Sequence, residues 1–240
     1  MIQARDVDYR SEEANLRGYL AIEENAVGPR PGVLVFHEGL GLGEFAMERA
    51  RRLAGLGYVA LAADMFGDRR QATNLQEAAT LVGGLRAEPE KLRARGRAAL
   101  AALAALPQVD AGRLAAIGFC FGGSVVLELA REGADLKAVV SFHGVLTTKM
   151  PAQPGLVKAS VLVCTGVEDP LAPPEQLADF ENEMHTGGVK DWQVIAYGNT
   201  LHGFTNPAAD GSIMRTALYN EQADRRSWAS MKSLFDEVLT

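Results

Sequence analysis

The chain has 240 residues, of which 48% are hydrophobic and 22% are charged, and this composition excludes disordered and fibrous proteins. Its 24 lysines and arginines against 30 aspartates and glutamates give a net charge of -6, which argues against a nucleic-acid-binding surface. No apolar stretch reaches the roughly 18 residues of a membrane helix, and residues 1–20 resemble neither a signal peptide nor a membrane anchor. With only two cysteines, Cys120 and Cys164, the sequence predicts a cytoplasmic protein without a disulfide framework.

Short apolar runs alternate with longer amphipathic runs along the chain. The alternating pattern of residues 16–23 predicts an antiparallel edge strand. The runs after it are, in order, strand 33–36, helix 44–56, strand 59–63, helices 75–85 and 90–106, strand 114–119, helix 123–132, strands 138–142 and 160–165, helix 174–185, strand 192–196 and helix 217–238. Repeated strand–helix units predict an α/β fold with a mostly parallel sheet and helices on both faces. No repeat or long linker interrupts the pattern, so we expect one domain over residues 1–240.

The sheet restricts where chemistry can occur, because ligands of such folds bind beyond the carboxyl ends of the parallel strands. Polar and ionisable residues that follow the predicted strands are therefore the candidates for a functional site. They are His37, Glu38, Asp64, Cys120, His143, Glu168, Asp169 and His202.

A predicted strand runs directly into the turn Gly118-Phe119-Cys120-Phe121-Gly122, and a predicted helix follows. This is the strand–turn–helix pattern of a nucleophile elbow, with cysteine as the nucleophile. Glycine two positions before and two after the nucleophile avoids collisions with the neighbouring strand and helix. The start of the helix stabilises negative charge on Cys120, and the Phe121 N–H is one candidate oxyanion-hole donor. The alternative is a buried structural cysteine, and this is the interpretation we adopt for Cys164 inside its strand.

A nucleophilic thiol needs a base, and the base needs an acid that orients it. The chain order nucleophile, acid, histidine of α/β-hydrolases selects His202, in the loop after the last strand. His185, which closes a predicted helix, fits a structural role better. Asp169 is the best-placed acid, because it follows a buried strand and precedes Pro170, and the alternative is a turn or capping role.

The loop after the strand 33–36 contains Glu38 and Gly39. Glycine lets the backbone approach a substrate, so the Gly39 N–H is the second candidate oxyanion-hole donor. Glu38 is expected to point into the site from the same turn. Its carboxylate would either accept the proton of the Cys120 thiol or raise the pKa of that thiol by like-charge repulsion. His37 is expected to be packed in the interior.

Six motifs in chain order make the sequence resemble the dienelactone hydrolase family (carboxymethylenebutenolidases), a branch of the α/β-hydrolase fold. They are HEGLGL (37–42), AADMFG (62–67), GFCFGG (118–123), SFHG (141–144), GVEDP (166–170) and HGFTNP (202–207). The resemblance implies a catalytic triad of Cys120, His202 and Asp169, an oxyanion hole near Gly39 and Phe121, and Glu38 as a thiol-activating residue. It also implies hydrolysis of an enol lactone or a related ester without a metal or an organic cofactor.

One motif departs from the family pattern. In the members that act on dienelactone, an arginine four residues after the catalytic histidine binds the substrate carboxylate, whereas this chain has Asn206. An amide lacks the charged, bidentate fork of arginine. Arg69, Arg70 and Arg86 lie in the region of the family's second substrate-binding arginine. The substrate-binding candidates are Asn206, Phe204 and Arg86.

The sequence therefore predicts a cysteine-dependent hydrolase of small lactones or carboxylic esters that acts through a thioester acyl-enzyme. One alternative is a general carboxylesterase or thioesterase that does not require a substrate carboxylate, which Asn206 favours. Another is a non-catalytic α/β protein that binds a small ligand. The oligomeric state is not indicated.

Overall fold

The computed structural model describes residues 1–24 and 27–240, and within them one sheet of eight strands runs through the molecule in the order β1-β2-β4-β3-β5-β6-β7-β8. The strands are β1 (Ile2–Ser11), β2 (Ala14–Glu23), β3 (Arg30–Phe36), β4 (Val59–Ala63), β5 (Val109–Phe119), β6 (Ala138–Phe142), β7 (Ser160–Gly166) and β8 (Trp192–Tyr197). From β4 to β8 every neighbouring pair is parallel. The structure confirms the predicted mostly parallel α/β architecture.

The two amino-terminal strands differ from the prediction. β2 is antiparallel to β4, as expected, but β1 pairs with it along its whole length and takes the edge position. The prediction that residues 16–23 form the edge is therefore wrong. β1 was missed because its sequence, IQARDVDYRS, is mostly polar and its side chains are largely exposed. The apolar alternation by which a half-buried strand is recognised is limited to Val7 and Tyr9.

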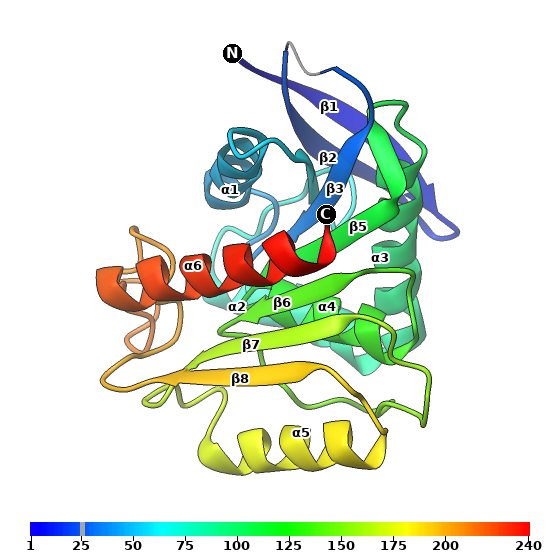
Figure 1. Ribbon diagram of the computed structural model, residues 1–240. Helices are drawn as coiled ribbons and strands as arrows, with labels where there is room; N and C mark the ends of the chain where they lie inside the picture. The colour runs from blue at the N-terminus through cyan, green and yellow to red at the C-terminus, as the bar shows by residue number, and fades with distance from the viewer. Residues whose placement is uncertain (25–26) are drawn as a thin grey trace.

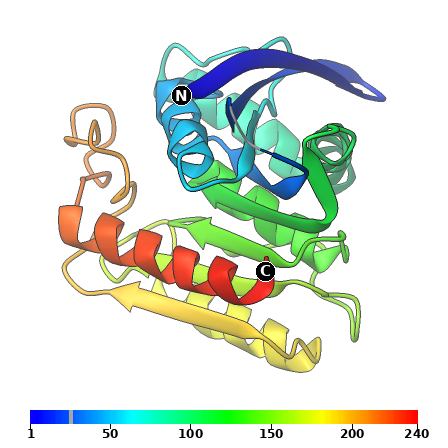
Figure 2. The same cartoon turned by 45° about the horizontal axis from the view of Figure 1, so that its top comes forward.

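Six helices of the described chain cover the sheet (Figure 1). They are α1 (Glu44–Ala54), α2 (Leu75–Ala87), α3 (Pro89–Ala104), α4 (Phe121–Arg131), α5 (Pro174–Thr186) and α6 (Glu221–Val238). Buried side chains of α1 and α6 form one apolar layer with the sheet, and those of α3, α4 and α5 form a second layer. Figure 2 shows α1 and α6 together on one face of the sheet. The predicted helices on both faces are therefore present.

The last helix begins later than predicted. The sequence indicated a helix from residue 217, but α6 starts at Glu221, after Asn220. The Asn220 side chain accepts a hydrogen bond from the Ala223 N–H at 3.1 Å, and asparagine is a preferred residue at this capping position. Residues 217–220 instead belong to the long segment between β8 and α6, drawn in orange tones in Figures 1 and 2.

The candidate residues follow the carboxyl ends of neighbouring strands. Glu38 follows β3, Cys120 follows β5, Asp169 follows β7 and His202 follows β8. Because parallel strands end at the same edge of a sheet, residues far apart in the sequence meet there. Among the described helices, none combines the length and the apolar character needed to cross a membrane.

Candidate active site

Cys120 occupies a strained turn between β5 and α4, with φ +53 and ψ -112. Positive φ is uncommon for a residue with a side chain, and two glycines make this turn possible. A Cβ on Gly118 would lie 1.9 Å from the Gly122 carbonyl oxygen, and a Cβ on Gly122 would lie 2.2 Å from the Phe36 carbonyl oxygen. Both distances are far inside van der Waals contact. The predicted reason for the two glycines is confirmed.

Two backbone amides, one at this turn and one in the turn after β3, are available for a ligand. In the described part of the chain, neither the Phe121 N–H, at the start of α4, nor the Gly39 N–H donates a hydrogen bond to another residue. Gly39 lines the same cavity as Cys120. Unpaired N–H groups at the start of a helix attract negative charge. The two turns are therefore together suited to stabilise an anion that forms on an atom beside the Cys120 sulfur.

His202 and Asp169 form a buried pair. The His202 Nδ1 lies 2.8 Å from the Asp169 Oδ2, and the two residues are 3% and 1% exposed. The second carboxylate oxygen, Oδ1, accepts a hydrogen bond from the Leu171 N–H at 2.9 Å. Among the described residues, the buried Nε2 of His202 has no hydrogen-bond partner. Asp169 thus fixes the orientation of the imidazole and leaves Nε2 free for a proton transfer.

The charges around His202 favour its protonated form. Burial of the ring opposes protonation, but the negative charge of the Cys120 thiolate and the Asp169 carboxylate outweigh it and raise the pKa of His202 to about 10. Cys120 and His202 line the same cavity, and Cys120 is half-buried. A negative charge on the Cys120 sulfur therefore stabilises the protonated form of His202.

Glu38 enters the site from the turn after β3, as the sequence predicted. Its Oε2 accepts a hydrogen bond of 2.7 Å from the Asn206 Nδ2. Burial raises the pKa of Glu38, although the hydrogen bond from Asn206 and the positive charges of His202 and Arg49 oppose this shift. The carboxyl group is therefore held by a neutral partner, not by an adjacent cation.

These groups surround a cavity of about 250 Å³. Its polar lining residues include Glu38, Cys120, His202 and Asn206. Its apolar lining residues are Leu40, Leu75, Ala78, Ala208, Ala209, Ile213, Met214 and Ala217. Among the described residues that line it there is no lysine or arginine. The cavity is suited to an uncharged, largely apolar molecule.

The other substrate-binding candidates lie elsewhere. Phe204 is fully buried, and its ring packs on the rings of His143 and Tyr197. Arg86 lines a neighbouring cavity of about 430 Å³ between the end of α2 and α4, where its Nη2 donates to the Thr147 Oγ1 at 2.9 Å. Of the three predicted substrate-binding side chains, the structure places only Asn206 at the cavity of Cys120.

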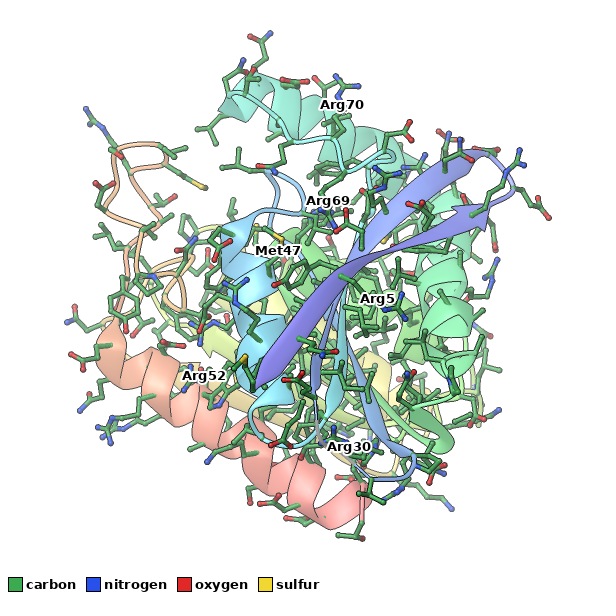
Figure 3. All side chains as sticks on the ribbon, turned by 90° about the horizontal axis from the view of Figure 1, so that it is seen from above. Arg5, Arg30, Met47, Arg52, Arg69 and Arg70 are labelled. Carbon is green, nitrogen blue, oxygen red and sulfur yellow. The ribbon has the colours of Figure 1, made fainter. Side chains whose placement is uncertain are left out.

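Two further arginines from the sequence analysis are engaged in ion pairs. Arg69 and Arg70 lie on the segment between β4 and α2 (Figure 3). Arg69 pairs with Asp6 at 2.7 Å, and Arg70 pairs with Glu77 at 2.6 Å. Neither side chain lines the cavity of Cys120. The region therefore brings no arginine into that cavity.

The other two strand-end histidines are fully buried. His37 is packed against Phe66, as expected, with ring centroids 4.8 Å apart. Its Nδ1–H donates to the Glu38 carbonyl oxygen at 2.6 Å, and its Nε2 accepts from the Met65 N–H at 3.2 Å. His37 therefore supports the backbone of the Glu38 turn. His143, which the sequence analysis left without a role, contacts the Cys120 turn.

The chain is similar to proteins of one family over nearly its whole length. The model of the dienelactone hydrolase family matches residues 16–239. An Escherichia coli (strain K12) protein named "Putative carboxymethylenebutenolidase" is 29% identical over 81% of this chain and 74% of its own. The solved structure named m3DLH is 46% identical, with a TM-score of 0.96 over 100% of this chain and 99% of that chain. The dienelactone hydrolase-like promiscuous phosphotriesterase P91, from metagenomic libraries, is 44% identical, with a TM-score of 0.95 over the same shares.

Proposed function

Because this chain belongs to the dienelactone hydrolase family and is a carboxylic ester hydrolase, we propose that Cys120 is its nucleophile, with His202 and Asp169 completing a catalytic triad. The observation that carries this proposal is the buried His202–Asp169 pair, in which the Nε2 of His202 has no partner among the described residues and His202 lines the same cavity as Cys120. A nucleophile, a base and an orienting acid in this order are the requirements of covalent acyl transfer.

The reaction begins with the Cys120 thiolate and the His202 imidazolium. The sulfur attacks the carbonyl carbon of the ester, and negative charge develops on the carbonyl oxygen. The N–H groups of Gly39 and Phe121 stabilise that oxygen, and one such donor typically contributes about 3 kcal/mol to a transition state. The carbon–oxygen bond of the ester then breaks, and His202 gives its proton to the leaving alkoxide. A thioester on Cys120 and a free alcohol result.

Water completes the cycle. The neutral His202 removes a proton from a water molecule that attacks the thioester carbonyl, and the carbon–sulfur bond breaks to release the acid. The thiolate and the imidazolium are thereby restored. Asp169 holds the imidazole in place throughout, and Glu38 is the remaining group that could exchange a proton with the Cys120 thiol.

We propose uncharged esters and lactones as the preferred substrates, over dienelactone with its carboxylate. The absence of a lysine or arginine from the described lining of the cavity supports this choice. Glu38 and Asp210, which belong to that lining, would repel an anionic substrate when ionised. Asn206 occupies the position that would otherwise supply a cation. We further propose a cytoplasmic location, which two free thiols favour.

The proposal is tested by steady-state hydrolysis of an uncharged aryl ester and of dienelactone. We expect kcat/KM to be larger for the aryl ester. We expect Cys120→Ala to lower it by about 10³-fold or more, and Asp169→Asn to lower it by about 10³- to 10⁴-fold. Cys164→Ala is the matched control, since Cys164 is a fully buried thiol of a strand and its replacement should leave the rate within a few-fold. Full activity of Cys120→Ala would overturn the proposal.

A second candidate reaction is the hydrolysis of uncharged phosphotriesters. It is supported by the 44% identity with a protein described as a promiscuous phosphotriesterase and by the largely apolar lining of the cavity, in which the described residues include no lysine or arginine. In this reaction the thiolate would attack phosphorus and expel an alcohol, and water would then break the sulfur–phosphorus bond. Release of a nitrophenol from an aryl dialkyl phosphate by the native chain, and its loss in Cys120→Ala, would support this activity. Equal release by both proteins would contradict it.

A further inference from the structure

His143 is a buried histidine that the proposed reaction does not use. It follows β6 directly, is 0% exposed and has φ +40. Such a backbone conformation is strained for a residue with a side chain, and strain of this kind persists where the surroundings enforce it. A buried imidazole must also satisfy two ring nitrogens. We therefore expect both ring nitrogens of His143 to have hydrogen-bond partners that hold the residue in this conformation.

The hydrogen bonds of His143 fix its tautomer. Its Nδ1 lies 3.1 Å from the backbone N of Cys120, and its Nε2 lies 2.8 Å from the Thr205 Oγ1. A backbone N–H can only donate, so Nδ1 must be the unprotonated nitrogen and Nε2 must carry the proton. The same Cys120 N–H also points to the Phe142 carbonyl oxygen at 3.0 Å. His143 is thus a second acceptor for the amide of the proposed nucleophile and a donor to Thr205.

The surroundings keep this ring neutral. Burial lowers the pKa of His143 well below its usual value, and the positive charges of His202 and Arg49 lower it further. The rings of His143 and His202 meet edge to face, with centroids 5.0 Å apart. The charged or titratable groups around His143 are therefore His202, Cys120 and Arg49. A neutral ring at this place does not repel the His202 imidazolium.

The backbone of Thr205 is held by a buried arginine. Its carbonyl oxygen accepts a hydrogen bond of 2.5 Å from the Arg49 Nη2, and Arg49 pairs with Asp224 at 3.1 Å. Arg49 is a residue of α1 and Asp224 is a residue of α6, and both are buried. Thr205 itself lies between His202 and Asn206 in the sequence. The segment that carries His202 is therefore fixed to α1 and α6 at Thr205, the residue whose hydroxyl accepts the hydrogen bond from His143.

We propose that His143 is a positioning residue that joins the Cys120 turn to the His202 segment through its two ring nitrogens. The inference rests on the proposed function, because it concerns how the nucleophile and its base are held relative to each other. Loss of this link removes the hydrogen bonds by which His143 connects the Cys120 turn to Thr205. A misplacement of about 1 Å between reacting groups can cost about 100-fold in rate.

Thr205→Val tests this link with little change of shape, because it replaces one hydroxyl by a methyl group. We expect kcat to fall about tenfold or more, KM to change less than twofold, and the apparent pKa values of the pH–rate profile to move. Thr205→Ser keeps the hydroxyl and should restore the native profile. Thr165→Val is the matched control, because the buried Thr165 Oγ1 has no hydrogen-bond partner in the described chain, and it should leave both kcat and the profile unchanged.

Identical kinetics of Thr205→Val and Thr165→Val would overturn the proposal. A second measurement does not depend on a variant: the nitrogen chemical shifts of His143 should report an unprotonated Nδ1 and a protonated Nε2 from pH 6 to pH 9. The opposite tautomer, or a charged ring in that range, would also overturn it. Failure of the proposed function is a separate outcome, since it would appear as full activity of Cys120→Ala regardless of any result at Thr205.

Discussion

The Asn206 Nδ2 donates a hydrogen bond of 2.7 Å to the Glu38 Oε2, across 168 positions of the sequence. The contact joins the turn after β3 to the segment after β8, and both residues line the cavity that Cys120 also lines. It holds a half-buried carboxyl group with a neutral donor. This relationship bears directly on which substrates the cavity accepts.

Asn206→Arg should shift the substrate preference toward carboxylate-bearing lactones. A guanidinium at this position adds the charged, bidentate donor that the cavity lacks. We expect the ratio of kcat/KM for dienelactone to that for an uncharged aryl ester to rise about tenfold or more, which is the effect of about 1.4 kcal/mol. Asn206→Gln is the control, since it keeps a neutral amide. An unchanged ratio in the arginine variant would contradict the role assigned to this position.

The pKa of His202 should depend on the sulfur of Cys120. In the native chain burial lowers this pKa, but the thiolate and Asp169 raise it to about 10. Cys120→Ala removes the thiolate while Asp169 remains, so the pKa should fall. Titration of the His202 ring signals by NMR in the two proteins measures the difference. Equal values in both would show that the thiolate does not act on this imidazole.

The same shift sets the sign of a pH effect on stability. The pKa of His202 is raised above its unfolded value of about 6.5, so its contribution is fully present below pH 6.5 and is lost as the pH rises through about 10. We expect the free energy of unfolding to decrease between pH 7 and pH 10.5 by a larger amount in the native chain than in Cys120→Ala. Chemical denaturation at both pH values provides the comparison. Parallel losses in the two proteins would speak against an ion pair.

The two thiols should react at very different rates. Cys120 is half-buried at a cavity, whereas Cys164 is 0% exposed and burial raises its pKa to about 12. Iodoacetamide at pH 7 should alkylate Cys120 about 100-fold faster or more, because the thiolate is the nucleophile and needs access. Peptide mapping by mass spectrometry separates the two sites. Equally slow alkylation of both thiols would count against an activated Cys120.

Gly122→Ala should lower the free energy of unfolding by about 3 kcal/mol or more, because the added methyl group overlaps backbone atoms that cannot shift to make room for it. Its Cβ would lie 2.2 Å from the carbonyl oxygen of Phe36 and cannot move away from the backbone. Gly84→Ala is the control, since nothing lies within 4 Å of a Cβ at that position of α2. It should stabilise the helix by about 0.5–1 kcal/mol. Urea denaturation of both variants checks the contrast.

The order of strands and helices was largely predictable from the sequence, because strands buried on both faces read as continuous apolar runs. The runs at β4 and β6 match the prediction residue for residue. The Cys120 turn and the contact of Asp169 with His202 were predicted from local glycine spacing and from the order of residues at strand ends. β1 was not predicted, because an exposed, mostly polar edge strand has too short an apolar pattern to indicate a strand.

Contacts between distant loops could not be read from local patterns. Nothing in the turn around Glu38 indicates that Asn206 is its partner, since each lies on a loop whose course depends on the packed fold. The same holds for Arg86, which faces a neighbouring cavity, and for Phe204, which supports His143. His143 was recognised as a strand-end residue. Its two hydrogen bonds depend on how the end of β6, the Cys120 turn and the segment that contains Thr205 pack together, which no local pattern indicates.

The central claim is that an acyl group passes through the sulfur of Cys120, and trapping that intermediate tests it most directly. The protein is mixed with an activated aryl ester, quenched in acid within the first turnover, and mapped by mass spectrometry. We expect the mass of one acyl group on the peptide that contains Cys120 and none on the peptide that contains Cys164. Turnover of the ester with the acyl group on another residue, or with Cys120 unmodified at every time before steady state, would contradict the account.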